Sequence, residues 1–276
     1  MKGRFFLKIC GSGVIAAFCL TACAAPPSVG NAEVVSRPTR LSPDQLQRVG
    51  QRIWQNECSG TIDGLTTWNS GEDFASLGIG HFIWYPTGKR GPFEESFPPL
   101  LVHLQRSGVQ LPEWLRQGGP CPWANRSSFL ADHQGARQQQ LRALLSQTVS
   151  QQTDFIAARM SASLPKMLAN APAGQRALVE GNFHVLQASP EGMFCLIDYV
   201  NFKGEGTSAT ERYNGQGWGL LQVLAGMTAD RSASAAFAES AKRVLTNRVR
   251  NSPAARGENR WLPGWLNRCE SYKRAL

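Results

Sequence analysis

The segment Ser76-Leu77-Gly78-Ile79-Gly80-His81 follows a predicted helix that ends at Glu57, and together these two features decide the fold that we expect. Ser42-Pro43-Asp44 supplies an N-cap, a proline at the first helical position and an early acidic residue. Apolar residues then recur at helical spacing over residues 46–53, on the face that also carries Glu57. The sequence therefore predicts an amphipathic helix whose carboxyl end presents an acidic side chain.

Glu57 is the first candidate for chemistry. Its apolar neighbour Ile53 and the negative end of the helix dipole both disfavour a carboxylate, which predicts a protonated general acid. The alternative is a solvated glutamate at a helix end, which is a common surface feature.

The residues after this helix predict a small β-hairpin. Residues 65–68 are β-prone, residues 69–71 form a turn, and residues 74–85 form a second extended run. In that run Gly78 and Gly80 fall on one face, where a bare backbone lets a ligand approach closely. A bulge is the alternative explanation for the two glycines.

The order of a helix that ends in Glu, a hairpin and S-L-G-I-G-H resembles the active-site segment of phage-type lysozymes. Residues 196–205 are similar to the core helix and following loop of that family, and residues 240–246 are similar to its C-terminal helix. The resemblance implies an α+β fold, mostly α-helical and lysozyme-like, with a small β-hairpin lobe that flanks the active-site cleft.

Carried over by this resemblance, Glu57 is the general acid and Ser76 stands where the family has a threonine that helps hold the nucleophilic water. His81 becomes the histidine that braces the site. The family's aspartate falls on Ser70, which cannot act as a base. We place this role on Glu72 in preference to Asp73, because strand alternation puts Glu72 on the face of Ser76.

Two reactions fit these residues. A carboxylate pair with room for water hydrolyses the glycosidic bond. A single acid instead performs lytic transglycosylation, in which the sugar's own hydroxyl attacks and leaves an anhydro end.

A second polar, glycine-rich loop follows the predicted helix 192–200. Its segment Gly219-Leu220-Leu221-Gln222 resembles the G-L-M-Q segment that lines the sugar cleft of lytic transglycosylases. The substrate-binding residues that we predict are His81, Asn201, Glu205, Tyr213, Trp218 and Gln222. Two alternatives stay open: Trp218 packs in the core, or Glu205 is itself the acid and Glu57 is structural.

The N-terminus has the form of a lipoprotein signal peptide over residues 1–22. Leu20-Thr21-Ala22-Cys23 looks like a lipobox, which implies lipidation of Cys23 and palmitate attachment. Ala24 in place of Asp resembles an outer-membrane sorting pattern, so we expect a lipid anchor in the outer membrane, facing the periplasm. A flexible tether over 23–41 and a lysozyme-like domain over 42–276 complete the predicted organisation. The alternative is an ordinary signal peptide.

Four cysteines remain beyond the leader and the lipobox, and an even count in an oxidising compartment predicts two disulfide bonds. Cys58–Cys121 with Cys195–Cys269 is the pairing that we favour among three. The net charge of +9 suits a polyanionic envelope surface. No nucleic-acid motif, metal-ligand spacing or cofactor motif appears, so we expect no nucleic acid, metal or cofactor.

Further helices are predicted at residues 99–106, 138–150, 154–160, 164–169, 174–179, 192–200, 217–225 and 234–250. The expected function is an enzyme that cleaves peptidoglycan glycan strands, as a muramidase or a lytic transglycosylase. The rival is a non-catalytic peptidoglycan-binding or structural envelope lipoprotein on the same scaffold.

Overall fold

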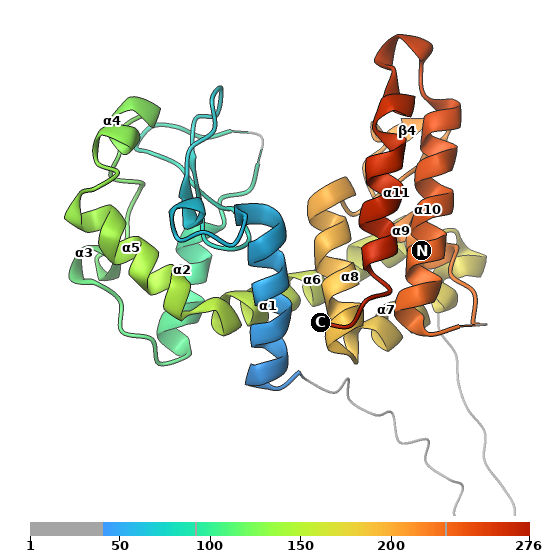
Figure 1. Ribbon diagram of the computed structural model, residues 1–276, viewed down its shortest axis with the longest axis horizontal. Helices are drawn as coiled ribbons and strands as arrows, with labels where there is room; N and C mark the ends of the chain where they lie inside the picture. The colour runs from blue at the N-terminus through green and yellow to red at the C-terminus, as the bar shows by residue number, and fades with distance from the viewer. Residues whose placement is uncertain (1–40, 92, 230) are drawn as a thin grey trace, which may run out of the picture. The chain divides into compact units, whose positions relative to one another are not determined.

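The computed structural model describes residues 41–91, 93–229 and 231–276 (Figure 1). All of them belong to a compact unit that comprises Arg37–Leu276. The predicted signal peptide, the lipidation site Cys23 and nearly all of the predicted tether lie outside the described residues.

Helices dominate this unit, and its strands are short. The helices are α1 (Pro43–Cys58), α2 (Phe97–Arg106), α3 (Glu113–Arg116), α4 (Arg126–Ala131), α5 (Ala136–Gln147), α6 (Val149–Asn170), α7 (Arg176–Gln187), α8 (Pro190–Lys203), α9 (Leu220–Ala225), α10 (Ala233–Asn251) and α11 (Leu262–Ser271). The strands are β1 (Thr66–Thr67), β2 (Ala75–Leu77), β3 (Phe82–Trp84), β4 (Arg212–Tyr213) and β5 (Gln216–Gly217). The predicted α+β class is therefore confirmed.

Helix α1 begins where the sequence predicts. The Ser42 hydroxyl accepts a hydrogen bond from the Gln45 amide, and the Gln45 side chain accepts one from the Ser42 amide, which completes a capping box. At the other end Ser59 adopts a left-handed conformation (φ 55°) and its N–H bonds to the Trp54 carbonyl. Both ends of α1 are thus set by local chemistry, which places Glu57 in its last turn.

Strands β1, β2 and β3 form a three-stranded antiparallel sheet in sequence order. Thr67 pairs with Ser76, and Ser76 pairs with Ile83. The predicted extended run over 74–85 is therefore two strands, and Gly78 to His81 form the turn between them. Gly78 has φ +70° and His81 has φ +47°, which is a turn conformation. Our prediction of a bare glycine face on one strand is wrong, because the chain reverses at these residues.

Several helices also differ from the prediction: α3 and α4 were not predicted, and α7 continues beyond residue 179. The predicted pieces 154–160 and 164–169 are one helix, α6, which continues through Pro165. Packing of α6 against α1, α2 and α8 offsets the hydrogen bond that the proline cannot make. The sequence does not predict helix α11, because a Pro-Gly pair near its start disfavours a helix.

The core of the unit lies between α1, α6 and α8 and continues through α7, α9, α10 and α11, which pack on one another. Ile53 of α1, Tyr199 of α8 and Phe237 of α10 are fully buried in it. Among the described residues, no helix combines the length and the apolar character needed to span a bilayer.

Candidate active site around Glu57

An arginine from the last helix meets the glutamate from the first. Arg268 of α11 donates from Nη2 to Glu57 Oε1 at 3.0 Å. The same guanidinium grips Asp198 of α8 through two bonds, from Nε to Oδ2 at 2.9 Å and from Nη2 to Oδ1 at 2.7 Å. Paired donors of this kind match the two oxygens of a carboxylate. Three helices that are distant in sequence therefore converge on Glu57.

Asp198 is the buried centre of this network, with its side chain 1% exposed. Two further groups donate to it: the Tyr272 hydroxyl to Oδ2 at 2.6 Å and the Asn56 amide to Oδ1 at 3.0 Å. Burial alone would lower the pKa of Arg268, but its hydrogen bonds to Asp198 raise that pKa above its usual range. The guanidinium therefore stays charged and holds Glu57 in place.

The turn between β2 and β3 lies against the end of α1. Cys58, which follows Glu57, has its Sγ 3.6 Å from the Gly78 carbonyl oxygen and 3.8 Å from His81 Nε2. Burial, with a smaller effect from Glu57, raises the pKa of the Cys58 thiol to about 12. The S-L-G-I-G-H segment thus contacts the residue next to the candidate acid.

A glutamine of α6 holds the same turn from the other side. Gln152 Oε1 accepts a hydrogen bond from the Ile79 amide at 3.1 Å, and Gln152 is itself fully buried. A Cβ on Gly78 would lie 2.4 Å from that oxygen. The positive φ and this close approach together explain why glycine occupies position 78.

The structure does not join the predicted base to Glu57. Glu72 Oε2 accepts a hydrogen bond from the Asn69 side chain in its own loop, at 3.1 Å. Asp73 pairs with Lys89 at 3.3 Å on the surface. Ser76 is 4% exposed and lies in the middle of the sheet. Among the described residues, no hydrogen bond or ion pair links any of these three to Glu57.

Glu57 has polar surroundings where we predicted apolar ones. Its side chain is 21% exposed, and Oε1 accepts from Arg268. Oε2 makes no hydrogen bond to a described residue. The carboxyl group thus has one oxygen oriented by Arg268 and a second without a described hydrogen-bond partner.

The second predicted constellation starts at the end of α8. Asn201 is exposed in the last turn of that helix. Glu205 follows the helix and pairs with Lys166 of α6 at 2.7 Å, with its side chain 27% exposed. Both residues are accessible, and within the described ranges neither forms a hydrogen bond or ion pair with Glu57 or Arg268.

Tyr213 and Trp218 are used for packing in this structure. The Tyr213 hydroxyl donates to Glu258 Oε1 at 2.9 Å, and its ring lies 4.6 Å from that of Trp218, which is 8% exposed. Arg248 stacks on Trp218 at 4.1 Å and donates twice to Glu258. These contacts support the alternative in which Trp218 packs in the core.

Gln222 closes the loop that precedes α9. Its Oε1 accepts from the Gly219 amide at 2.9 Å, and its Nε2 donates to the Gly206 carbonyl at 3.2 Å. Gln222 also lines a cavity of about 500 Å³ together with Asn170, Gln216, Asn247 and two arginines. This predicted binding residue thus holds its own loop and faces an amide-lined cavity.

Lys203 lies between the two charged networks. Its Nζ is 3.5 Å from the centre of the Trp265 ring and 4.0 Å from that of Phe202. Burial, followed by the neighbouring charge of Arg248, lowers the pKa of Lys203 to about 7. The Lys203 amine therefore loses its proton more readily than the amine of an exposed lysine.

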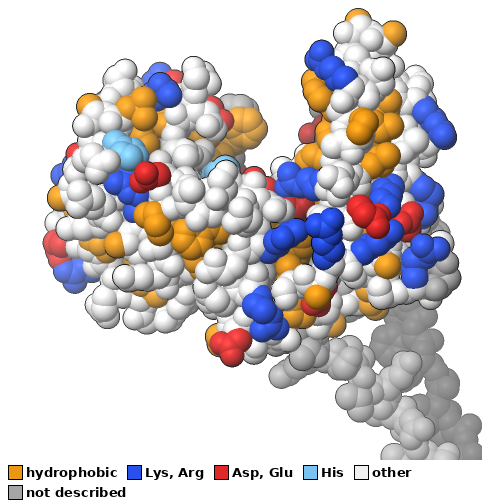
Figure 2. All heavy atoms as spheres, in the orientation of Figure 1, with side chains coloured by type: hydrophobic (Ala, Val, Ile, Leu, Met, Phe, Trp, Pro, Cys, Tyr) orange, Lys and Arg blue, Asp and Glu red, His pale blue; other side chains and the backbone are white. Residues whose placement is uncertain are grey.

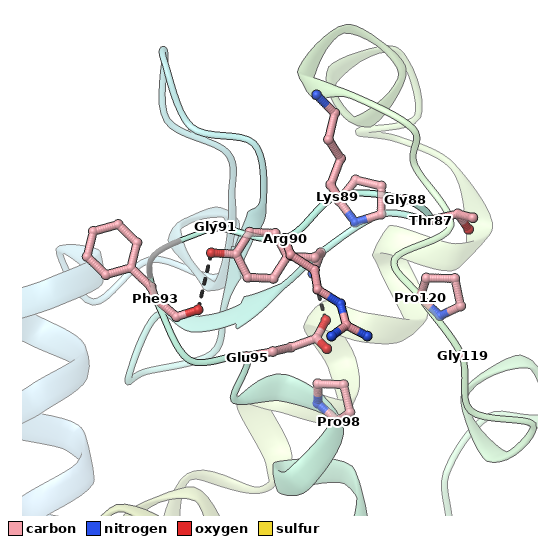
Figure 3. Close-up of a pocket in the computed structure, with 12 residues that line it drawn as sticks. Thr87, Gly88, Lys89, Arg90, Gly91, Phe93, Glu95, Pro98, Gly119 and Pro120 are labelled. Carbon is pink, nitrogen blue, oxygen red and sulfur yellow. Dashed lines mark hydrogen bonds between the residues drawn. The ribbon is translucent and has the colours of Figure 1, made fainter.

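A separate cavity of about 680 Å³ lies beside the sheet (Figure 3). Figure 3 shows Lys89, Arg90, Phe93 and Glu95 on the chain around it, where Glu95 accepts from the Tyr85 amide at 2.8 Å. It holds none of the residues that the sequence singles out, so its size alone gives it no role in the candidate site.

The four cysteines outside the leader are free and buried in the structure, namely Cys58, Cys121, Cys195 and Cys269. Cys195 and Cys269 are close enough for the charge of one to affect the pKa of the other. The two predicted disulfide bonds thus stay a prediction, which counting the free thiols of the unfolded, unreduced protein would test.

Sequence reasoning missed Asp198 and Arg268. The aspartate within the apolar stretch 192–200 was a signal of a buried ion pair, since a carboxylate is rarely buried without a partner. Arg268 lies in α11, whose apolar residues Leu262, Trp265 and Cys269 recur at helical spacing and were a signal for the helix. That pattern does not mark Arg268 itself, because a charged residue on an amphipathic helix is ordinary.

Comparison with models of protein families, with curated proteins and with solved structures finds no match for this chain. The described residues also hold no group of three or more His, Cys, Asp or Glu side chains arranged to bind a metal ion.

Proposed function

We propose that the protein cleaves the glycan strands of peptidoglycan, with Glu57 as the general acid. The observation that carries this proposal is the position of Glu57 in the last turn of α1, where Arg268 orients one carboxyl oxygen and the turn ending in His81 lies against the next residue. Figure 2 adds that the surface is hollowed between the lobe that carries the three-stranded sheet and the region of α10 and α11.

The surroundings of Glu57 favour the reaction that needs one carboxyl group. A proton on Oε2 passes to the glycosidic oxygen as the C1–O bond breaks. The sugar's own hydroxyl then attacks C1 and returns its proton to Glu57, which leaves an anhydro end. Glu72 bonds within its own loop, so this route of lytic transglycosylation agrees better with the contacts than hydrolysis by a carboxylate pair does.

The second candidate is a non-catalytic glycan-binding lipoprotein. Two observations favour it: Ser70 replaces the family's aspartate, and Glu57 takes part in an ion-pair network that also stabilises the fold. A binder needs no transferable proton, so the two functions differ in one measurable step.

Glu57→Gln separates these functions. The amide oxygen of glutamine still accepts from Arg268, but the side chain has no proton to transfer. We expect digestion of purified sacculi to fall at least about a hundredfold, while sacculus binding is unchanged. Mass spectrometry of the muropeptides should show anhydro ends for the wild type.

Glu205→Gln is the matched control, because it removes the rival acid at the end of α8. Normal digestion by Glu57→Gln together with loss in Glu205→Gln would move the acid to Glu205. If the wild type binds sacculi but does not digest them, the protein is the non-catalytic glycan binder.

The anchoring proposal is independent of the chemistry. We propose that Cys23 carries the lipid and holds the protein on the periplasmic face of the outer membrane. Palmitate labelling that persists in Cys23→Ser would contradict it.

A further inference from the structure

Two adjoining cavities follow the outer side of α1 where it meets the C-terminal residues. One has a volume of about 350 Å³ and is lined by Arg52, Asn56, Arg268 and Arg274 with three other residues of α11. The other has about 410 Å³ and continues along α1 past Arg48, with Arg52 common to both. We call this pair of cavities the basic groove. Figure 2 shows Lys and Arg side chains gathered over this part of the surface.

The lining supplies donors and lacks side-chain carboxylates. Guanidinium groups alternate with the amides of Gln47, Gln51 and Gln55 along α1, and Asn267 adds an amide from α11. Asn56 and Ser271 also line the groove, but their donors already bind Asp198 and the Arg268 carbonyl. No aspartate or glutamate of the described chain lines either cavity, and the terminal residue Leu276 lines the second one. Arg268 already holds Asp198 and Glu57, so the uncommitted charges of the groove are Arg48, Arg52 and Arg274, none of which forms an ion pair with a described residue.

Three arginines without a described ion-pair partner lie close together along the basic groove. Arg48 and Arg52 are four residues apart on one face of α1, where like charges repel each other. Arg274 adds a third positive charge from the facing segment. An anion bound between them would remove this repulsion and satisfy the open donors.

We propose that the basic groove binds a phosphate group, either free or in the headgroup of a phospholipid. A carboxylate offers two oxygens in one plane, which a single guanidinium satisfies. A phosphate offers oxygens in several directions, and the guanidinium groups of Arg52 and Arg274 reach the groove from two separate segments. The elongated shape of the two joined cavities has room for a phosphodiester and its glycerol. The proposal does not depend on Glu57 as an acid.

Isothermal titration of the full-length protein in a non-ionic detergent tests the proposal with inorganic phosphate as the probe. The test variant is Arg52→Gln/Arg274→Gln, which leaves Arg268 and the candidate active site untouched. Arg250→Gln is the matched control, because Arg250 is exposed on α10 and makes no ion pair with a described residue.

We expect the double variant to lose at least tenfold in phosphate affinity, while the control keeps that of the wild type. Equal affinity in all three proteins, absence of binding to the wild type, or equal affinity for acetate would each overturn the proposal. Sacculus digestion by the double variant should equal that of the wild type, which separates this test from that of the proposed function.

Glycerophosphoglycerol, the soluble headgroup of an anionic phospholipid, distinguishes the two sources of phosphate. Tighter binding of this diester than of inorganic phosphate assigns the groove to the membrane surface. Tighter binding of inorganic phosphate assigns it to a free anion.

Discussion

Arg268 bonds to two carboxylates, Asp198 and Glu57, which differ in their burial. Asp198 is almost completely buried, so its charge depends on the guanidinium and on the donors of Tyr272 and Asn56. Glu57 is partly exposed and depends on the same guanidinium only for its orientation. One side chain thus stabilises the fold through Asp198 and positions the candidate acid through Glu57.

Arg268→Ala separates the buried interaction from an ordinary surface charge. Removing one partner of a buried ion pair leaves an uncompensated charge, so we expect a loss of about 3–5 kcal/mol in the free energy of unfolding. Urea denaturation measures this loss. Arg250→Ala is the control, with an expected change within about 0.5 kcal/mol. A loss below about 1 kcal/mol for Arg268→Ala would show that water or another donor satisfies Asp198.

At the scale of elements, the turn between β2 and β3 is the most constrained segment near the site. It has α1 on one side through Cys58 and α6 on the other through Gln152. Gly78 lies between these contacts with a positive φ. The turn therefore contacts both α1 and α6, which also pack directly on each other.

Gly78→Ala should destabilise the protein through two effects. An alanine at φ +70° costs roughly 1–2 kcal/mol. Its Cβ would also displace Gln152, which adds about 1–3 kcal/mol. Thermal or urea unfolding measures the sum.

Gly71→Ala is the control for the first effect, because Gly71 has φ +87° and no described atom lies within 4 Å of the position that its Cβ would take. If both variants lose the same free energy of unfolding, the displacement of Gln152 does not destabilise the protein.

The elements could be predicted from the sequence wherever their causes are local. Ser42 and Pro43 set the start of α1, and the β-prone stretches became strands of the sheet. Strand alternation failed at Gly78, because it takes no account of a positive φ. The contact between Glu57 and Arg268 spans 211 residues of sequence, and no local pattern on either helix specifies it.

For the whole molecule, burial of charge makes stability depend on pH at two ends of the scale. Glu258 has its pKa lowered to about 2, chiefly by hydrogen bonds from Arg248. Its contribution to stability is therefore present above its ordinary pKa of 4.5 and is lost as the pH falls toward 2. Lys203 acts in the opposite region, because its pKa is lowered from 10.5 to about 7.

The sign for Lys203 follows from proton counts. Between about pH 7 and 8.5 the unfolded chain keeps the proton of Lys203 and the folded protein releases it, so the free energy of unfolding rises with pH. Lys203→Met keeps an unbranched side chain against Trp265 and removes the titration. We expect the free energy of unfolding of the wild type to rise, relative to that of Lys203→Met, as the pH increases across this interval. Urea titrations at both of its ends measure the change.

Lys89→Met is the control for a lysine whose side chain is exposed. If the free energies of unfolding of wild type and Lys203→Met differ by the same amount at both pH values, the amine stays protonated in the folded protein.

The contact between the first and last helices also orders events during synthesis. A chain that emerges from the ribosome with its N-terminus first presents Glu57 long before Arg268 exists. Every nascent or prematurely ended chain that stops before α11 has the carboxyl group without the guanidinium that orients it. Synthesis of α11 is thus a requirement for assembly of the site, because this helix supplies Arg268.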